Sequence, residues 1–174
     1  MKKVTNIMVD CETLGVVPGC SILSIGACSF DLTRTFYRSI THESCRAYGF
    51  HEELPTVRWW CKQKDSVIVE AFAGGSSIEA ALEDFAQFLK QFESFRIWSK
   101  GADFDLPILS RAFYLIGDPT PWEKNTGCFR TLQETFPDIP LPDRRELEAH
   151  NALNDALYQA AHAQWIIRSR RLPF

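Results

Sequence analysis

Three apolar, strand-like segments in the first forty residues restrict the folds open to this chain more than any other feature. Residues 4–9 are rich in β-branched side chains, and two further apolar runs follow at 21–30 and 34–40. The last of these segments, 34–40, reads as a strand although it includes two arginines, and only residues 31–33 separate it from the second, which is short enough for a hairpin. The chain should therefore begin with antiparallel strands.

The rest of the sequence alternates helical patterns with one short strand. Helices are predicted for 55–63, for a segment that a Ser76–Glu79 capping box opens, for 106–115, and for 151 to about 168. A strand is expected at 96–98, a loop at 117–127, and a proline-marked irregular segment from 137 to 142. This order predicts an α/β fold in which a mixed sheet has helices on both faces.

Length and charge limit the organisation and the class of function. The 174 residues contain no repeat or linker, so we expect one domain spanning 1–174. With 19 basic and 22 acidic residues the net charge is −3, which excludes binding of long nucleic acid by bulk charge alone. Any contact with nucleic acid has to be made at a local site.

The compartment also follows from the sequence. Residues 13–30 carry no charge, but Pro18 and several glycines and serines interrupt the run, so no membrane span is expected. The six cysteines form no CxxC pair, and several lie in apolar runs. We therefore predict a reduced, cytoplasmic protein.

Two carboxylates mark the end of the first strand. Asp10 and Glu12 are two residues apart, so the pleat turns both side chains to one side, where they repel each other. Mg²⁺ or Mn²⁺ resolves such a conflict because hard cations prefer carboxylate oxygens. Alone, the pair fits equally a strand end that meets solvent.

Three more residues complete a candidate site at element ends. Asp105 follows the 96–98 strand; it is a metal ligand or the cap of the next helix, and Asp103 is its nearest competitor. His150 and Asp155 can converge only if the histidine precedes the helix proper, with Asn151 as N-cap. The alternative for His150 is an exposed loop histidine.

Four carboxylates match the charge of two divalent cations, which points to phosphodiester hydrolysis. Asp10 is placed to bridge the cations, Glu12 and Asp155 to complete the nucleophile-side ion, and Asp105 to hold the other. His150 is expected to act as general base on the attacking water.

The motif set resembles the DEDDh (DnaQ-like) 3′→5′ exonuclease superfamily, which has an RNase H-like fold. The similar segments are Asp10-Cys11-Glu12-Thr13, Gly101-Ala102-Asp103-Phe104-Asp105 and His150-Asn151-Ala152-Leu153-Asn154-Asp155. Thr56-Val57-Arg58-Trp59-Trp60 and Gln63 further resemble a phage, prophage and actinobacterial branch of exoribonucleases and exonuclease VIII-like proteins. Gly101 departs from the asparagine or histidine usual there, so a hydrogen bond from that position is missing.

The resemblance implies a five-stranded sheet, two Mg²⁺ or Mn²⁺ ions, and single-stranded DNA or RNA 3′ ends as partners, cut to nucleoside 5′-monophosphates. It also implies Thr13 and Leu14 as contacts to the terminal nucleotide, although Leu14 equally suits loop packing, and it allows a homodimer. At most one of Trp59 and Trp60 can face the site, and core packing is favoured for each. A non-catalytic nucleic-acid-binding or assembly module and an RNase H-like endonuclease are the alternatives.

Overall fold

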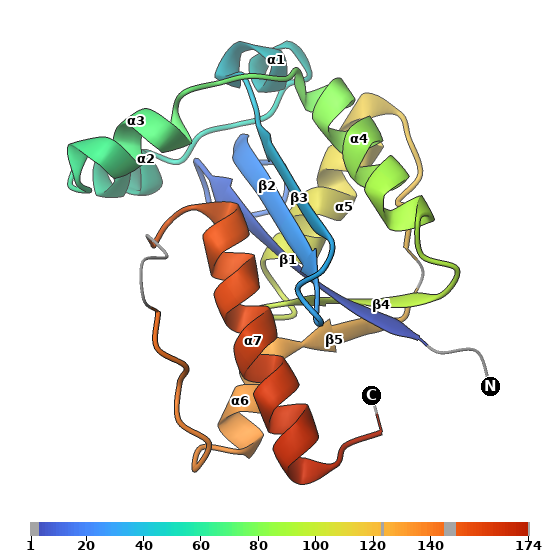
Figure 1. The fold of residues 1–174 in the computed structure, drawn as a ribbon. Coiled ribbons are helices and arrows are strands. Elements are labelled where there is room, and N and C mark those ends of the chain that lie inside the picture. Colours follow the sequence, from blue (N-terminus) through green and yellow to red (C-terminus); the bar gives the residue numbers. More distant parts are fainter. Residues whose placement is uncertain (1–3, 123, 145–148, 174) are drawn as a thin grey trace.

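The computed structural model describes residues 4–122, 124–144 and 149–173, and its centre is one mixed sheet (Figure 1). The strand order is β3-β2-β1-β4-β5. Strand β1 pairs antiparallel with β2 and parallel with β4; β3 pairs antiparallel with β2, and β5 parallel with β4. This is the predicted five-stranded sheet, whose strands are β1 Thr5–Thr13, β2 Ile22–Ser29, β3 Thr35–Ser39, β4 Phe95–Ser99 and β5 Thr126–Cys128.

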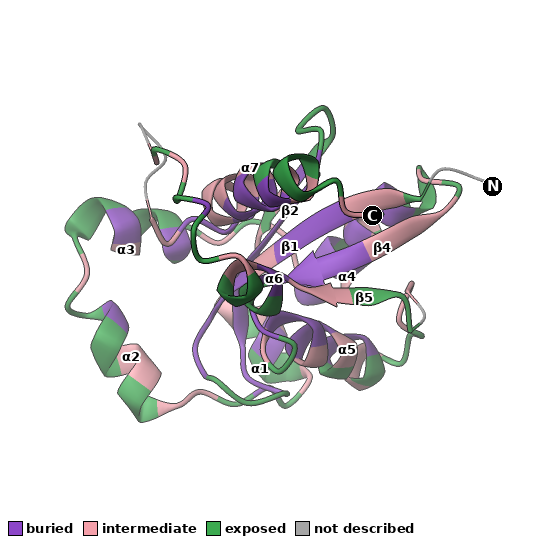
Figure 2. Ribbon diagram, turned by 90° about the horizontal axis from the view of Figure 1, so that it is seen from below, coloured by how far each residue is buried: buried purple, intermediate pink, exposed green. Residues whose placement is uncertain are grey.

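Helices lie on both faces of the sheet, as predicted (Figure 2). Helix α7 packs along β1, β2 and β3, whereas α4 contacts β3 and α5 contacts β1 from the opposite side. The helices of the described chain are α1 His42–Ala47, α2 Leu54–Trp60, α3 Asp65–Ala71, α4 Ile78–Lys90, α5 Asp105–Ile116, α6 Phe129–Thr135 and α7 Ala152–Arg170.

The alternation of side chains along β1 decides which residues face α7. Ile7, Val9 and Cys11 belong to the apolar core that α4 and α5 cover. Met8 belongs instead to a second core that includes α7. Because side chains alternate along a strand, Asp10 and Glu12 also face α7.

The first turn of α7 lies unusually close to the sheet. A Cβ atom on Gly26 of β2 would be 2.2 Å from the backbone of Ala152 and of Leu153. Glycine at this position therefore allows the start of α7 to rest directly on β2, beside the carboxylates of β1.

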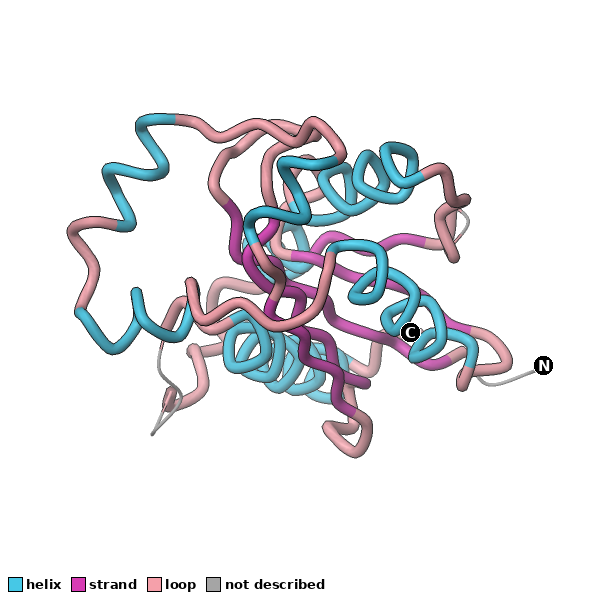
Figure 3. Tube along the Cα trace, turned by 90° about the horizontal axis from the view of Figure 1, so that it is seen from above, coloured by secondary structure: helices cyan, strands magenta, loops and turns pink. Residues whose placement is uncertain are grey.

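Helices α2 and α3 form an arm beside the sheet (Figure 3). Trp60 fastens this arm: its ring is buried, and its Nε1–H donates to the Thr13 carbonyl at 2.9 Å. Leu14, Leu23 and Val67 pack with Trp60 in a separate apolar cluster. The arm is thus tied to the end of β1.

Several sequence predictions were wrong in detail. Strand β1 continues through Asp10 and Glu12 to Thr13 because β2 still pairs with it there. Ser77, not Ser76, caps α4 by accepting from the Ala80 N–H, since the backbone of Ser76 is bonded to the end of β3. The three-residue strand β5 begins inside the expected 117–127 loop, where it is too short for a periodic signal.

No helix in the described ranges is long and apolar enough to cross a membrane. The uncharged segment 13–30 instead supplies the last residue of β1, a turn, and all of β2. The six cysteines are all free.

Candidate active site at the open end of β1

The site lies where β1 loses one of its two neighbouring strands. Pairing between β1 and β4 stops at Met8 and Trp98, whereas pairing with β2 continues to Thr13. On the open edge, the Cys11 N–H donates to Asp105 Oδ1 at 3.0 Å. The carboxylate of Asp105 therefore takes the place of a strand partner.

Asp105 is the first residue of α5 and is only 2% exposed. The N-cap position belongs to Phe104, so the alternative prediction that Asp105 caps this helix is wrong. Its carboxylate points to β1 instead. Asp103 lies outside this contact, in a separate groove.

The two carboxylates of β1 meet α7. Asp10 Oδ1 accepts a hydrogen bond of 2.7 Å from Gln159 Nε2. Glu12 is 9% exposed and lies on the same face of the strand. Gln159 escaped the sequence prediction, although it follows Asp155 by four residues and so shares its helix face.

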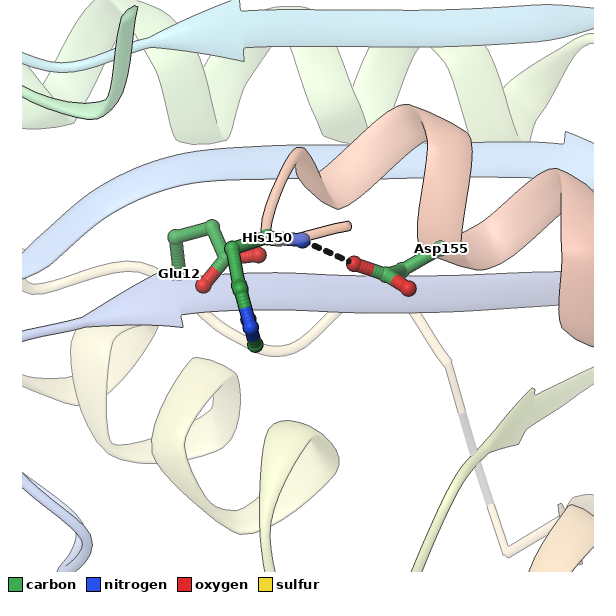
Figure 4. A group of neighbouring side chains, drawn as sticks. All are labelled: Glu12, His150 and Asp155. Carbon is green, nitrogen blue, oxygen red and sulfur yellow. Dashed lines mark hydrogen bonds between the residues drawn. The ribbon is translucent and has the colours of Figure 1, made fainter. Parts of the chain in front are cut away.

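His150 reaches the carboxylates through a backbone turn. It has a φ of 65°, in the left-handed region, and its N–H donates to Asp155 Oδ2 at 2.8 Å (Figure 4). Asn151 caps α7, as predicted, by accepting from the Asn154 N–H at 3.0 Å. The prediction that the histidine precedes the helix proper is confirmed.

The residues nominated from sequence converge. One ligand atom from each of Glu12, His150 and Asp155 lies within 4.8 Å of the other two. Asp10 and Asp105 belong to the same electrostatic cluster, since the charges of Asp105, Glu12 and Asp155 all act on Asp10.

Burial and like charge together raise the pKa values of the cluster. Burial, and then the charges of its three acidic neighbours, raise the pKa of Asp10 well above its usual range. Burial and the charges of Asp155 and Asp105 raise the pKa of Glu12 to about 8. Burial raises the pKa of Asp105 to about 7, against the hydrogen bond from Cys11.

This donor set fits divalent cations. Isolated buried carboxylates destabilise a fold unless a positive charge compensates them. Arg144 supplies part of that charge: it pairs with Asp155, and it also opposes the rise in the pKa of Glu12. Carboxylate oxygens are the ligands that Mg²⁺ and Mn²⁺ prefer.

A cavity of about 550 Å³ adjoins the carboxylates. Trp59 lines it, is 40% exposed, and meets the His150 ring edge-on at 4.8 Å between centroids. Trp60 also borders the cavity but is 2% exposed. Core packing, the prediction favoured for each tryptophan, therefore holds for Trp60 but not for Trp59, which is exposed and lines the cavity.

Of the two expected nucleotide contacts, only Thr13 lines this cavity. The side chain of Leu14 is 2% exposed and packs in the cluster around Trp60. Its N–H donates to the Ser21 carbonyl, and its carbonyl accepts from the Glu53 N–H. The expectation that Leu14 lines the terminal nucleotide is therefore corrected: Leu14 packs the loop.

The arm also supports the histidine, which sequence reasoning missed. Asn151 Nδ2 donates to Glu70 Oε1 of α3, and Trp59 of α2 packs on the His150 ring. These contacts join segments that are eighty or more residues apart, so no local sequence pattern predicts them.

Comparison with solved structures shows a shared fold. The nuclease domain of 3′hExo, a DEDDh family member bound to rAMP, aligns with a TM-score of 0.61 and 10% identity, covering 95% of this chain and 92% of that one. S. pombe Pop2p in its Mg²⁺- and Mn²⁺-bound form aligns with a TM-score of 0.57 and 16% identity, covering 95% and 83%. E. coli Exonuclease I, in complex with a 5cy-dA13 oligonucleotide, aligns with a TM-score of 0.64 and 15% identity over 96% of this chain and 41% of its own.

Sequence comparison is more specific. No curated protein matches the chain significantly. A family model described as the 3′-5′ exoribonuclease Rv2179c-like domain matches residues 5–167. With the sheet order and the carboxylate cluster in place, this match means that the chain belongs to the Rv2179c-like family of 3′-5′ exoribonuclease domains.

Proposed function

We propose that residues 1–174 act as one domain that removes nucleoside 5′-monophosphates from the 3′ ends of single-stranded RNA. The observation that carries this proposal is the meeting of four carboxylates and His150 where β1 and β4 part. A non-catalytic binding module would have no need to keep these mutually repelling, buried acids together.

Four acidic side chains are proposed to hold two divalent cations, Mg²⁺ or Mn²⁺. Asp10 would contribute to both ions, Glu12 and Asp155 to one, and Asp105 to the other. When bound, such ions supply an activated water and stabilise the leaving oxygen of the phosphodiester. The raised pKa values of Glu12 and Asp105 support this role, because both carboxylates gain from a compensating cation.

His150 is proposed as the general base. Its backbone N–H is tied to Asp155, and its ring rests against Trp59, so the imidazole is oriented from two sides. From this position the ring takes a proton from the attacking water. The cavity beside it receives the terminal nucleotide, with Thr13 at one wall and the exposed ring of Trp59 as a stacking surface for the base.

RNA is the proposed substrate because the family model is described as an exoribonuclease domain. Matched RNA and DNA oligomers, single- and double-stranded, should be digested side by side with Mg²⁺ and with Mn²⁺. We expect mononucleotide products and faster loss of single-stranded RNA. Internal fragments would instead indicate an endonuclease, and binding without cleavage in Mn²⁺ would indicate a binding module.

Assembly and location complete the proposal. The free cysteines support a cytoplasmic, reducing location. A homodimer is the assembly to test, by sedimentation of the protein at the concentrations used in the digestion.

A further inference from the structure

Gly101 lies at a point where the backbone excludes a side chain. Its φ is +115°, a conformation that favours glycine. A Cβ atom there would be 3.1 Å from Asp103 Oδ1 and 3.2 Å from Arg130 Nη2. The guanidinium of Arg130 therefore occupies the space beside the backbone that a side chain at position 101 would enter.

Arg130 and Lys100 face a groove of about 400 Å³ next to the active-site cavity. Val16, Asp103 and Phe104 complete the lining of this groove. Val16 and Phe104 also line the cavity, so the two hollows adjoin. The groove has two cationic side chains and one carboxylate, whereas Glu12 and Glu53 are the charged residues lining the cavity.

The groove around Arg130 reaches the catalytic cluster. Phe104 lines both hollows, and the next residue is Asp105, the first residue of α5. Arg130 itself is exposed, and its Nη2 makes only a long contact of 3.5 Å to the Lys100 carbonyl. The guanidinium is thus close to the site and open to solvent.

A nucleic-acid strand carries one phosphate per nucleotide, and the protein around the scissile phosphate is acidic. A nucleic-acid strand that enters such a site is repelled unless a positively charged side chain binds the phosphate next to the scissile one. Arginine suits this task, because its planar guanidinium binds phosphate oxygens in pairs. The net charge of −3 makes a local contact of this kind more important, since bulk attraction is missing.

We propose that Arg130, assisted by Lys100, binds the backbone phosphate one nucleotide upstream of the scissile bond. This inference rests on the proposed function and names a positioning contact for it. Arg130, which lies on α6, would thereby take the place of the asparagine or histidine side chain that is usual at position 101 and that Gly101 lacks.

Two dinucleotides that differ by one phosphate give the sharpest test. The substrate pNpN carries a 5′-phosphate upstream of its single scissile bond, and NpN lacks it. The wild-type protein should cleave pNpN with a kcat/KM at least about tenfold higher. In Arg130→Gln this preference should fall to about twofold or less through a higher KM for pNpN, while NpN is cleaved as before.

Ionic strength provides a readout that a purely structural role would not change. For a longer oligonucleotide, the dependence of log(kcat/KM) on log[salt] should become shallower by about 0.7 in Arg130→Gln, the value for one contact to a single strand. Arg130→Lys keeps the charge and should retain the slope with part of the preference. Arg168→Gln, at the far end of α7, removes an exposed arginine and should leave both measurements unchanged.

The outcomes separate this inference from the proposed function. A wild-type protein that cleaves neither dinucleotide nor any longer oligomer contradicts the function itself. Cleavage of pNpN and NpN at equal rates, or an equal loss on both in Arg130→Gln and Arg130→Lys, leaves the exonuclease standing and overturns the phosphate contact.

Discussion

The two halves of strand β1 differ in their pairing and in their side chains. Residues 5–8 pair with β4, and Ile7 and Met8, which are fully buried and apolar, also pair with β2 on the other side. Residues 9–13 pair only with β2, and they carry Asp10 and Glu12. A single strand thus serves as the centre of the core and as the floor of the site.

The difference shows how a stable sheet tolerates an unfavourable cluster of charges. The first half contributes hydrogen bonds to both neighbouring strands and buried apolar area, both of which favour folding. In the second half, β4 no longer pairs with β1, and the carboxylate of Asp105 accepts a hydrogen bond from the open edge. The proposed site for cations and substrate lies at this opening in the sheet.

The largest effect should follow from removing a carboxylate from the second half. Asp10→Ala or Asp155→Ala should lower kcat on a short labelled oligonucleotide about a thousandfold or more, because these acids act as a unit. EDTA should do the same, reversibly. Glu83→Gln, an exposed acid on α4, is the matched control; undiminished turnover in Asp10→Ala would contradict the assignment of the site.

Loss of the histidine should reduce rate without removing metal. His150→Gln should lower kcat by about 10²–10⁴-fold, the usual contribution of a general base. Calorimetric titration with Mn²⁺ should show affinity within a few-fold of wild type. If the variant instead loses its metal, His150 is a ligand and the general-base role is wrong.

A change in the first half should affect stability and spare the chemistry. Ile7→Ala leaves a cavity in the core and should lower the free energy of unfolding by about 2–5 kcal/mol. Denaturant unfolding gives this value, and kcat measured well below the transition should stay near wild type. The control is Val4→Ala, since Val4 is 41% exposed; equal losses in the two variants would contradict the central role of residues 5–8.

The smallest effect concerns pH and the metal-free protein. Because the pKa of Glu12 is raised to about 8, the folded state holds a proton that the unfolded chain releases near pH 4.5. Stability from this group is full below pH 4.5 and is lost as pH rises through about 8. Glu12→Gln should therefore raise the unfolding temperature at pH 8 by about 2–4 °C, the shift that 1 kcal/mol produces in a chain of this length.

Thermal unfolding of the wild-type protein in EDTA checks the same sign. Its unfolding temperature should fall between pH 5 and pH 8, and Mg²⁺ should restore more of it at pH 8, where a larger fraction of the carboxyl ligands is deprotonated. An unfolding temperature that rises with pH in EDTA would show that burial does not raise the pKa values of these acids.

Sequence pattern was sufficient for the elements with strong periodicity. The hairpin at 31–33, the α4 and α5 segments and the Asn151 cap of α7 all form as predicted. The short elements α1, α3, α6 and β5 were not predicted. They have three to seven residues each, so tertiary contacts decide their structure more than local propensity does.

The candidate site was likewise predicted only in part from the sequence. The four acids and His150 were nominated from strand ends and spacing, and they converge in the structure. Leu14 was nominated from the family resemblance, with loop packing as the alternative, and in the structure it packs beside Trp60. Gln159 was missed as a neighbour of the site because its partner Asp10 is 149 residues away. Arg144 and Arg130 were missed because no local pattern links them to the acidic residues.

By itself, the sequence determined the order of the longer strands and helices and the identity of the acidic side chains, since alternation, caps and spacing act over a few residues. Only the tertiary structure decided where β4 stops pairing with β1, how the backbone of His150 turns, and that the Arg130 side chain lies beside Gly101. These features depend on contacts between distant segments, and such contacts exist only after the sheet and α7 have packed together.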